Sequence, residues 1–287
     1  MVTIGELYTN VKAILKKIDS DTYLFDAKCI MEHAFMTELP KLLISSATVA
    51  SEDTVKRIKK MLDKRETGYP LQYILGEWEF YGLPMKVGEG VLIPRPDTET
   101  IIDTILEKYS ERTKNAPQIA DLCSGSGCIA ITLKKYIPDS SVTAIEYSDD
   151  AIKYLRENAQ LNGADIKIVK GDVLDERTAR CFEKLDILVS NPPYLTGEEM
   201  DTLQTEVSFE PELALRGGDD GLDYYRKITP LWRNSIKSGG IILYEIGMGQ
   251  ENDVTAILQE NGFENILYSR DTAGIIRIVS AEKKQED

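Results

Sequence analysis

Beyond Asp97 the chain alternates short apolar stretches with amphipathic ones, and this alternation limits the possible fold more than any other feature of the sequence. The pattern predicts strands and helices in regular turn. Such alternation is typical of βαβ units, in which helices cover both faces of a largely parallel sheet. The expected strands cover about 118–122, 142–146, 166–170, 185–190, 240–246, 265–269 and 275–280, and the expected helices about 128–136, 149–161, 222–236 and 250–261.

The first part of the chain has a different character. Thr3 and Glu6 have the spacing of a capping box, and apolar residues recur at helical spacing in three stretches that begin near Thr3, Asp21 and Ser51. Residues 68–96 are richer in aromatic residues, glycine and proline, a pattern that indicates a β-hairpin. The sequence therefore predicts a small helical domain over 1–67, a β-hairpin linker over 68–96 and a large α/β domain over 97–287.

The charge of the chain is unevenly distributed. It has 34 basic and 48 acidic residues, a net charge of −14. Residues 1–90 carry 12 basic and 13 acidic side chains and the remainder 22 and 35, which argues against a broad nucleic-acid surface on the large domain. We expect the basic cluster to be a solvated helix face. This cluster consists of Lys56, Arg57, Lys59, Lys60, Lys64 and Arg65.

Location and metal content follow from simple patterns. No apolar run approaches the roughly 18 residues of a membrane-spanning helix, and the N-terminus lacks the pattern of a secretion signal, so we expect a cytoplasmic protein without membrane contact. One histidine, His33, and four cysteines without C-x-x-C spacing predict no metal site. A monomer is the default expectation. The cysteines are Cys29, Cys123, Cys128 and Cys181.

The first strand of the α/β domain runs into a glycine loop, residues 121–130, Asp-Leu-Cys-Ser-Gly-Ser-Gly-Cys-Ile-Ala. Gly125 and Gly127 let the backbone approach a ligand where a side chain would collide. The next strand ends at Glu146, whose carboxylate can accept the two hydroxyls of a ribose. Loop and acid together predict a nucleoside site, although the same pattern also fits the dinucleotide sites of dehydrogenases.

Two further strands end in polar groups. At the end of the third strand, Asp172 is placed to accept a hydrogen bond from the exocyclic amine of an adenine. Val173 is placed to contact the face of the adenine ring. The fourth strand runs directly into the tetrapeptide 191–194, Asn-Pro-Pro-Tyr. An amide or aromatic amine nitrogen is a poor nucleophile because its lone pair is delocalised, so a catalyst must accept its hydrogens. The oxygen of Asn191 and the carbonyl of Pro192 can do this, and Tyr194 offers a flat face for stacking.

The sequence resembles class I S-adenosylmethionine-dependent methyltransferases, and among them the PrmC/HemK family, which methylates the side-chain amide of a glutamine in peptide chain release factors. The resemblance covers nearly the whole chain. Its motifs are PLQYILGEWEFYG (70–82), LIPRPDTE (92–99), DLCSGSG (121–127), NPPY (191–194), FEPELALRGGDDGLDYYR (209–226), YEIGMGQ (244–250) and the terminal Asp271, Gly274 and Arg277.

The resemblance implies a Rossmann-like, seven-stranded, mostly parallel sheet. It also implies that S-adenosyl-L-methionine is converted to S-adenosyl-L-homocysteine as methyl is transferred to the N5 nitrogen of the glutamine in the Gly-Gly-Gln motif of class-1 release factors, modulating translation termination. The implied cofactor-binding residues are Cys123, Ser124, Gly125, Ser126, Gly127, Glu146, Asp172, Val173 and Asn191. Those implied for the substrate glutamine and its catalysis are Asn191, Pro192, Pro193 and Tyr194.

The resemblance further implies that the N-terminal helices and the hairpin help to recognise the release factor, with Phe80 and Tyr81 lining the substrate pocket. Cys123 departs from the wider methyltransferase pattern, which has glycine there, and Glu146 stands where aspartate is commoner. We expect these departures to alter packing and reach without loss of cofactor binding.

Other functions fit parts of this pattern. A nucleic-acid amine methyltransferase would use the same tetrapeptide on a captured adenine or guanine. An NAD-dependent oxidoreductase would use the same glycine loop, and a scaffold protein could retain the fold without catalysis. Strongly salt-dependent nucleic-acid binding, hydride transfer or a lack of affinity for S-adenosylmethionine would respectively favour these three.

Overall fold

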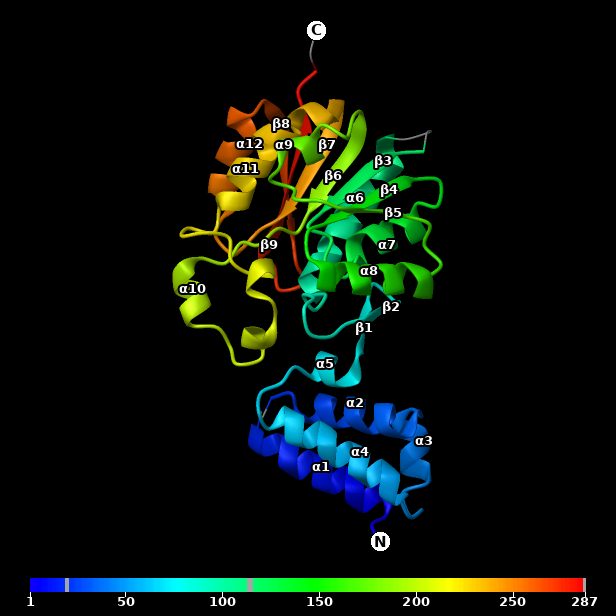
Figure 1. Cartoon of the computed structure of the whole chain (residues 1–287). Helices are drawn as coiled ribbons and strands as arrows, with labels where there is room; N and C mark the ends of the chain where they lie inside the picture. The colour runs from blue at the N-terminus through cyan, green and yellow to red at the C-terminus, as the bar shows by residue number, and fades with distance from the viewer. Residues whose placement is uncertain (19–20, 113–115, 286–287) are drawn as a thin grey trace. The chain divides into compact units, whose positions relative to one another are not determined.

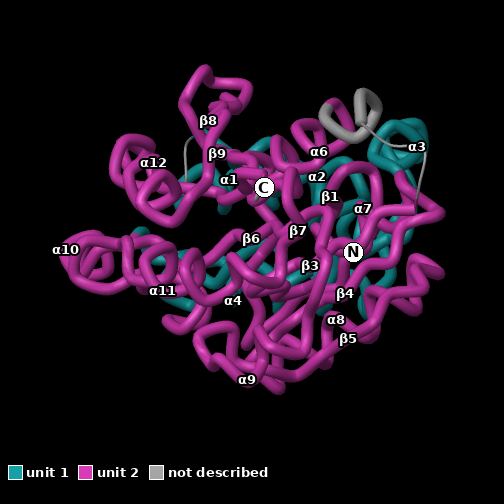
Figure 2. Tube along the Cα trace, turned by 90° about the horizontal axis from the view of Figure 1, so that it is seen from above, with its two compact units in different colours: residues 1–77, 204–209 teal, residues 78–203, 210–287 magenta. Residues whose placement is uncertain are grey.

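The computed structural model describes residues 1–18, 21–112 and 116–285, and these form two compact units. Unit 1 contains Met1–Glu77 together with the short segment Gln204–Phe209, and unit 2 contains Trp78–Leu203 and Glu210–Asp287. Figure 2 shows the two units in different colours. The predicted linker 68–96 is thus shared between them, and the three-part division of the sequence stays a prediction.

Unit 1 is helical. The capping box at its first helix is confirmed, because the Glu6 N–H donates to Thr3 Oγ1 at 3.2 Å and the Thr3 N–H donates to Glu6 Oε2 at 2.9 Å. Val11, Ile30 and Ile58 are buried on the inner faces of the long helices. The helices are α1 (Ile4–Ile18), α2 (Tyr23–Phe35), α3 (Leu39–Ile44), α4 (Glu52–Arg65) and α5 (Leu71–Leu75). Two short helices, α3 and α5, were not predicted from the sequence because they span less than two turns and show no clear periodicity.

One member of the basic cluster does not lie on a solvated face. Arg65 is buried in unit 1, where its Nη2 lies 2.9 Å from Asp26 Oδ2 and 2.7 Å from Glu206 Oε1. Phe209, at the end of the same short segment, packs edge-on against Tyr69 with ring centroids 5.2 Å apart. These contacts hold Gln204–Phe209 in unit 1, although its neighbours in the chain belong to unit 2.

Unit 2 is built on a seven-stranded sheet, visible edge-on in Figure 1. Its strand order is β5-β4-β3-β6-β7-β9-β8. The first five strands in this order pair in parallel, and β9 pairs antiparallel with both β7 and β8. In register, Leu122 pairs with Ile145 and Ser190, and Ser190 pairs with Tyr244, so four strands end together. The strands are β3 (Gln118–Leu122), β4 (Ser141–Glu146), β5 (Lys167–Lys170), β6 (Leu185–Ser190), β7 (Ile236–Glu245), β8 (Phe263–Arg270) and β9 (Ile276–Lys283). A separate hairpin pairs β1 (Glu77–Phe80) with β2 (Leu83–Lys86).

Alternate residues of the central strands β3 and β6 enter two different cores. Ile119 and Ile187 face one core, with α6 to α8, whereas Ala120 and Leu188 face the other, with α9, α11 and α12. This three-layer arrangement confirms the predicted α/β fold. The helices are α6 (Glu99–Arg112), α7 (Cys128–Tyr136), α8 (Asp149–Leu161), α9 (Glu176–Ala179), α10 (Gly197–Asp201), α11 (Asp223–Trp232) and α12 (Glu251–Glu260). No helix in the described ranges is long and apolar enough to cross a membrane.

Candidate active site

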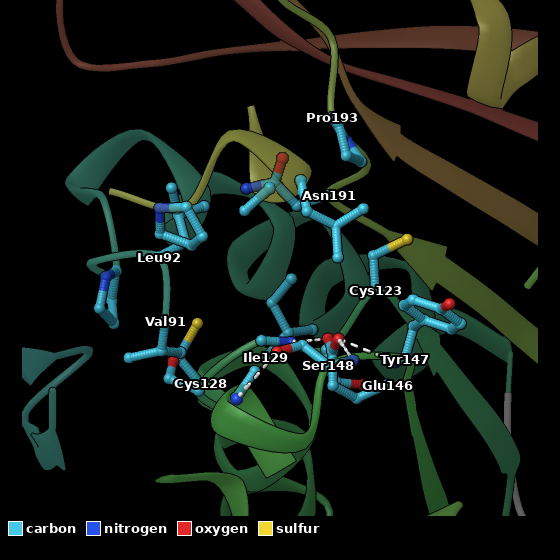
Figure 3. A pocket seen from close by; sticks show the side chains of 18 of the residues that line it. Val91, Leu92, Cys123, Cys128, Ile129, Glu146, Tyr147, Ser148, Asn191 and Pro193 are labelled. Atoms are coloured by element: carbon cyan, nitrogen blue, oxygen red, sulfur yellow. Dashed lines mark hydrogen bonds between the residues drawn. The ribbon is translucent and has the colours of Figure 1, made fainter. Parts of the chain in front are cut away.

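A cavity lies at the ends of β3, β4 and β6, where the chain leaves three neighbouring parallel strands. Ligands bind at this edge of open α/β sheets because the loops diverge there and leave a crevice. Figure 3 shows Asn191 and Pro193 on one side of the cavity and Glu146, with its hydrogen bonds, on another. Predicted site residues in the cavity wall are Cys123, Ser124, Gly125, Ser126, Glu146, Asp172, Val173, Asn191 and Pro193.

The glycine loop turns sharply between β3 and α7. Cys123, Gly125 and Gly127 all have positive φ, at 59°, 53° and 82°. Only glycine adopts this region without a steric cost, so the backbone at Cys123 is strained. At Gly127 a Cβ would also lie 2.2 Å from Leu155 Cδ1, so a side chain there would displace Leu155 of α8 in addition to straining the backbone.

Asp121 fixes the base of this loop, a role that its position in the sequence did not reveal. Its Oδ2 accepts from the Ala130 N–H at 3.2 Å, and its carbonyl accepts from Ser124 Oγ at 2.7 Å. Complete burial raises the pKa of the carboxyl group to about 7. An acid at the end of an otherwise apolar buried strand is the signal that could have identified it.

Glu146 is held rigidly at the end of β4. Its Oε1 accepts from the N–H groups of Tyr147 and Ser148, both at 2.8 Å, and its Oε2 accepts from the Gly125 N–H, also at 2.8 Å. Since a carboxylate has about four lone-pair sites, Oε2 keeps capacity to accept from a ligand hydroxyl. The same side chain therefore ties the glycine loop to β4 and faces the cavity.

Asp172 and Val173 follow β5, at the next strand end. Asp172 is exposed and its Oδ1 accepts from the Leu174 N–H at 2.8 Å, which orients the side chain. Val173 is 5 % exposed, and its carbonyl accepts from the Trp232 indole at 2.8 Å. Val173 thus forms part of the core as well as of the cavity wall.

The tetrapeptide 191–194 divides between the cavity and its support. Asn191 donates from Nδ2 to Thr98 Oγ1 at 3.3 Å, which leaves Oδ1 available as an acceptor. Pro192 is buried, and Tyr194 donates its hydroxyl to Glu245 Oε1 at 3.3 Å. Burial raises the pKa of the Tyr194 phenol, with the Glu245 charge acting in the same direction, so the hydroxyl stays protonated.

Glycines from two later motifs let the chain pass close to Tyr194. A Cβ on Gly217 would lie 2.6 Å from Tyr194 Cα, and one on Gly221 would lie 2.2 Å from the Tyr194 carbonyl oxygen. That oxygen accepts from Gln250 Nε2 at 3.1 Å. The segments 216–221 and 244–250 therefore pack against Tyr194 and support the tetrapeptide. This packing explains why glycine stands at positions 217 and 221.

A second wall of the cavity comes from residues 90–95 and Thr98 and from Pro211, Leu213 and Ala214. The resemblance implies that the linker 68–96 roofs the pocket, but none of these residues was singled out in the sequence as a site residue. The two segments are joined by Glu210, whose Oε2 accepts from the Ile93 N–H at 2.9 Å and whose Oε1 pairs with Arg95. The Glu210 side chain is 1 % exposed and that of Arg95 34 %. This buried ion pair brings together two segments more than a hundred residues apart, which no local pattern can predict.

Comparison with known proteins identifies the family of the chain. Residues 6–76 match the PrmC N-terminal domain and residues 98–211 match the methyltransferase small domain. The chain is 38 % identical to a release factor glutamine methyltransferase of Clostridium acetobutylicum, and the match covers 94 % of each of the two chains. It belongs to the release factor glutamine methyltransferase family. Another relative of that name, from Thermodesulfovibrio yellowstonii, is 36 % identical over 91 % of this chain and 92 % of its own.

Solved structures share the fold at lower identity. A methyltransferase from Pyrococcus furiosus has a TM-score of 0.53 at 16 % identity, covering 82 % of this chain and 100 % of its own. The catalytic domain of hMettl16, solved in complex with a 3'UTR hairpin, has a TM-score of 0.56 at 15 % identity, covering 83 % and 84 %. Both show that this family member has the methyltransferase fold.

The structure does not bring every predicted residue of this family member to the cavity. Phe80 is 1 % exposed and packs in the core of unit 2. Tyr81 donates its hydroxyl to Asp103 at 2.6 Å and stacks edge-on against Tyr136. Neither lines the cavity, so neither has a place in the site proposed below. Gly127, Pro192 and Tyr194 support the wall from behind.

Proposed function

We propose that the protein transfers a methyl group from S-adenosyl-L-methionine to the side-chain amide nitrogen of the glutamine in the Gly-Gly-Gln motif of class-1 release factors, modulating termination. The observation that carries this proposal is one shared cavity. A nucleoside-binding loop with its acid, Glu146, opens onto the same space as the amide of Asn191, a hydrogen-bond acceptor suited to another amide.

The residues present fit the cofactor. Gly125, where an added Cβ would enter open space, and the tethered carboxylate of Glu146 form a cradle in the cavity wall. Glu146 would accept hydrogen bonds from the ribose hydroxyls and Asp172 would accept one from the adenine amine. Val173 would contact the adenine ring. Cys123 to Gly127 and Asn191 would surround the rest of the cofactor. S-adenosylmethionine supplies an electrophilic methyl group when bound.

The chain's own part in the reaction is orientation. Asn191 Oδ1 would accept an amide hydrogen and Pro193 would confine the planar amide, so that the nitrogen lone pair faces the methyl group. Pro192 and Tyr194, which do not line the cavity, would hold these two residues in place. Such positioning can supply roughly 7–11 kcal/mol, whereas each hydrogen bond contributes about 1–3 kcal/mol. The extra proton then leaves to water, and no strong base is needed.

A protein substrate suits the charge of the chain better than a nucleic acid does. The net charge of −14 repels phosphates, and the exposed lysines of α4 are too few to form a broad basic surface. Action as a monomer in the cytoplasm belongs to the same proposal.

Methyl transfer from radiolabelled S-adenosylmethionine tests the proposal. A release factor should be labelled, its Gly-Gly-Ala variant should not, and total RNA at equal mass should remain unlabelled. Labelling of RNA with an unlabelled release factor would instead establish the nucleic-acid alternative.

A further inference from the structure

Glu245, at the end of β7, is buried beside the tetrapeptide and has no place in the reaction as described above. It is 1 % exposed. It follows Tyr244, the register partner of Ser190, so it lies level with Asn191, which comes directly after the neighbouring strand β6. Its Oε1 accepts from the Tyr194 hydroxyl, while its Oε2 is buried without a hydrogen-bond partner among the described residues. Burying a carboxyl group so incompletely paired is costly, which calls for a reason.

The second neighbour of Glu245 is Thr98, which is 2 % exposed. Its Oγ1 accepts from Asn191 Nδ2 at 3.3 Å. Its hydroxyl lies close enough to the Glu245 carboxyl group to lower the pKa of that group. A hydroxyl can donate only one hydrogen bond. When Thr98 donates it to the Glu245 carboxylate, the lone pairs of the Thr98 oxygen remain to accept from Asn191 Nδ2. The direction of every bond from Asn191 through Thr98 to Glu245 is then fixed.

We propose that Glu245 is a positioning residue for methyl transfer, acting through Thr98 and Tyr194 to fix both ends of the tetrapeptide and to turn Asn191 Oδ1 toward the substrate amide. The part of this inference that concerns the substrate rests on the proposed function. With Asn191 held by its Nδ2, the acceptor end of the side chain faces the cavity, whereas a flipped amide would offer two donors to a substrate that is itself a donor.

The ionisation of Glu245 should control this orientation. Burial raises its pKa to about 7, Thr98, Tyr194 and Arg277 oppose the shift, and Asp97 adds to it. Burial also raises the pKa of the other titratable groups nearby, Tyr194, Tyr225 and Cys128, so these stay protonated near neutrality. When Glu245 is ionised it can only accept hydrogen bonds, so the Thr98 hydroxyl must be the donor between them. The Thr98 oxygen can then only accept from Asn191, which holds Nδ2 toward Thr98 and Oδ1 toward the cavity.

Nuclear magnetic resonance of the full chain tests the orientation without any substrate. With 15N-labelled asparagine, the Asn191 side-chain signal, assigned from its loss in Asn191→Ala, should shift with pH around a midpoint near 7. Glu245→Gln should abolish that transition. Asp121→Asn, which removes the other buried carboxyl group with a pKa of about 7, should leave it in place. An Asn191 signal that does not titrate, or that titrates equally in Glu245→Gln, would overturn the proposal.

A matched pair at Thr98 tests the consequence for catalysis. Thr98→Val keeps the volume and removes the hydroxyl, and should lower kcat about tenfold or more, with Kd for S-adenosylmethionine changed less than about threefold. Thr98→Ser restores the hydroxyl and should recover most of kcat. A Thr98→Val enzyme with unchanged kcat would contradict the proposal. If the unmodified protein methylates no release factor, the proposed function fails, while the resonance experiment still decides the role of Glu245.

Discussion

At the residue scale, the site depends on buried groups that serve the loops rather than the ligand. Asp121 holds the base of the glycine loop, Glu146 its tip and Thr98 the side chain of Asn191. The sequence identifies residues that face the cavity because motifs mark strand ends. It does not identify Thr98, Glu210 or Glu245 as supports, because their partners are distant in the chain.

Asp121 should make stability depend on pH. Its pKa is about 7 in the folded protein against an ordinary value of 3.8, so between these values the folded state holds a proton that the unfolded state has lost. The free energy of unfolding therefore falls as pH rises through this interval. In Asp121→Asn the fall should be smaller, by on the order of 2–4 kcal/mol. Urea unfolding at about pH 5 and about pH 8 measures it, and an equal fall in both proteins would disprove the assignment.

Glu146→Ala should weaken binding of S-adenosylmethionine by about 1–3 kcal/mol, because it removes a charge-assisted acceptor for the ligand and for the backbone N–H groups of Gly125, Tyr147 and Ser148. Isothermal titration calorimetry measures the affinity. Glu157→Ala, a change at a half-exposed carboxylate of α8, serves as the control and should have no effect. Unchanged affinity in Glu146→Ala would place the ribose elsewhere.

At the scale of elements, the sequence predicts the helices and strands that have a clear periodic pattern. It does not predict helices that are short or that are stabilised by packing against residues distant in the chain. The bounds of β3, α7, α8 and β6 agree with the pattern, since strand and helix periods are clear there. The pattern extends α11 to residue 236, but the helix ends at Trp232 and β7 begins at Ile236. Helix α6 has no sequence prediction, although Ile101, Ile102 and Ile105 bury it against the sheet, because its stability comes from that packing.

The ion pair around Arg65 should stabilise unit 1 more than a surface pair of the same chemistry. Asp26→Asn leaves a guanidinium, 3 % exposed, with Glu206 as its remaining carboxylate, and should lower the free energy of unfolding by about 2–4 kcal/mol. Glu176→Gln breaks the exposed pair with Arg180 and should cost less than about 1 kcal/mol. Denaturant unfolding of both variants provides the measurement, and equal losses would show that the Arg65 pair has no special role.

At the scale of the whole molecule, the chain crosses between the two units at three points, near residues 77, 203 and 209. The last crossing leads from Phe209 directly to Glu210, which joins the two segments of the cavity wall. No local pattern predicts this route, because Gln204–Phe209 contacts residues more than a hundred positions earlier. The family resemblance nevertheless includes it, since FEPELAL begins at Phe209 and LIPRPDTE contains Arg95.

The central claim is that one cavity holds the methyl donor opposite Asn191, which orients a glutamine amide. Tandem mass spectrometry of a release factor incubated with this protein and S-adenosylmethionine tests it most directly, with Asn191→Ala as the control. We predict a mass gain of one methyl group on the glutamine of Gly-Gly-Gln with the unmodified protein and almost none with the variant. A methyl group on another residue, or equal methylation by Asn191→Ala, would contradict this account.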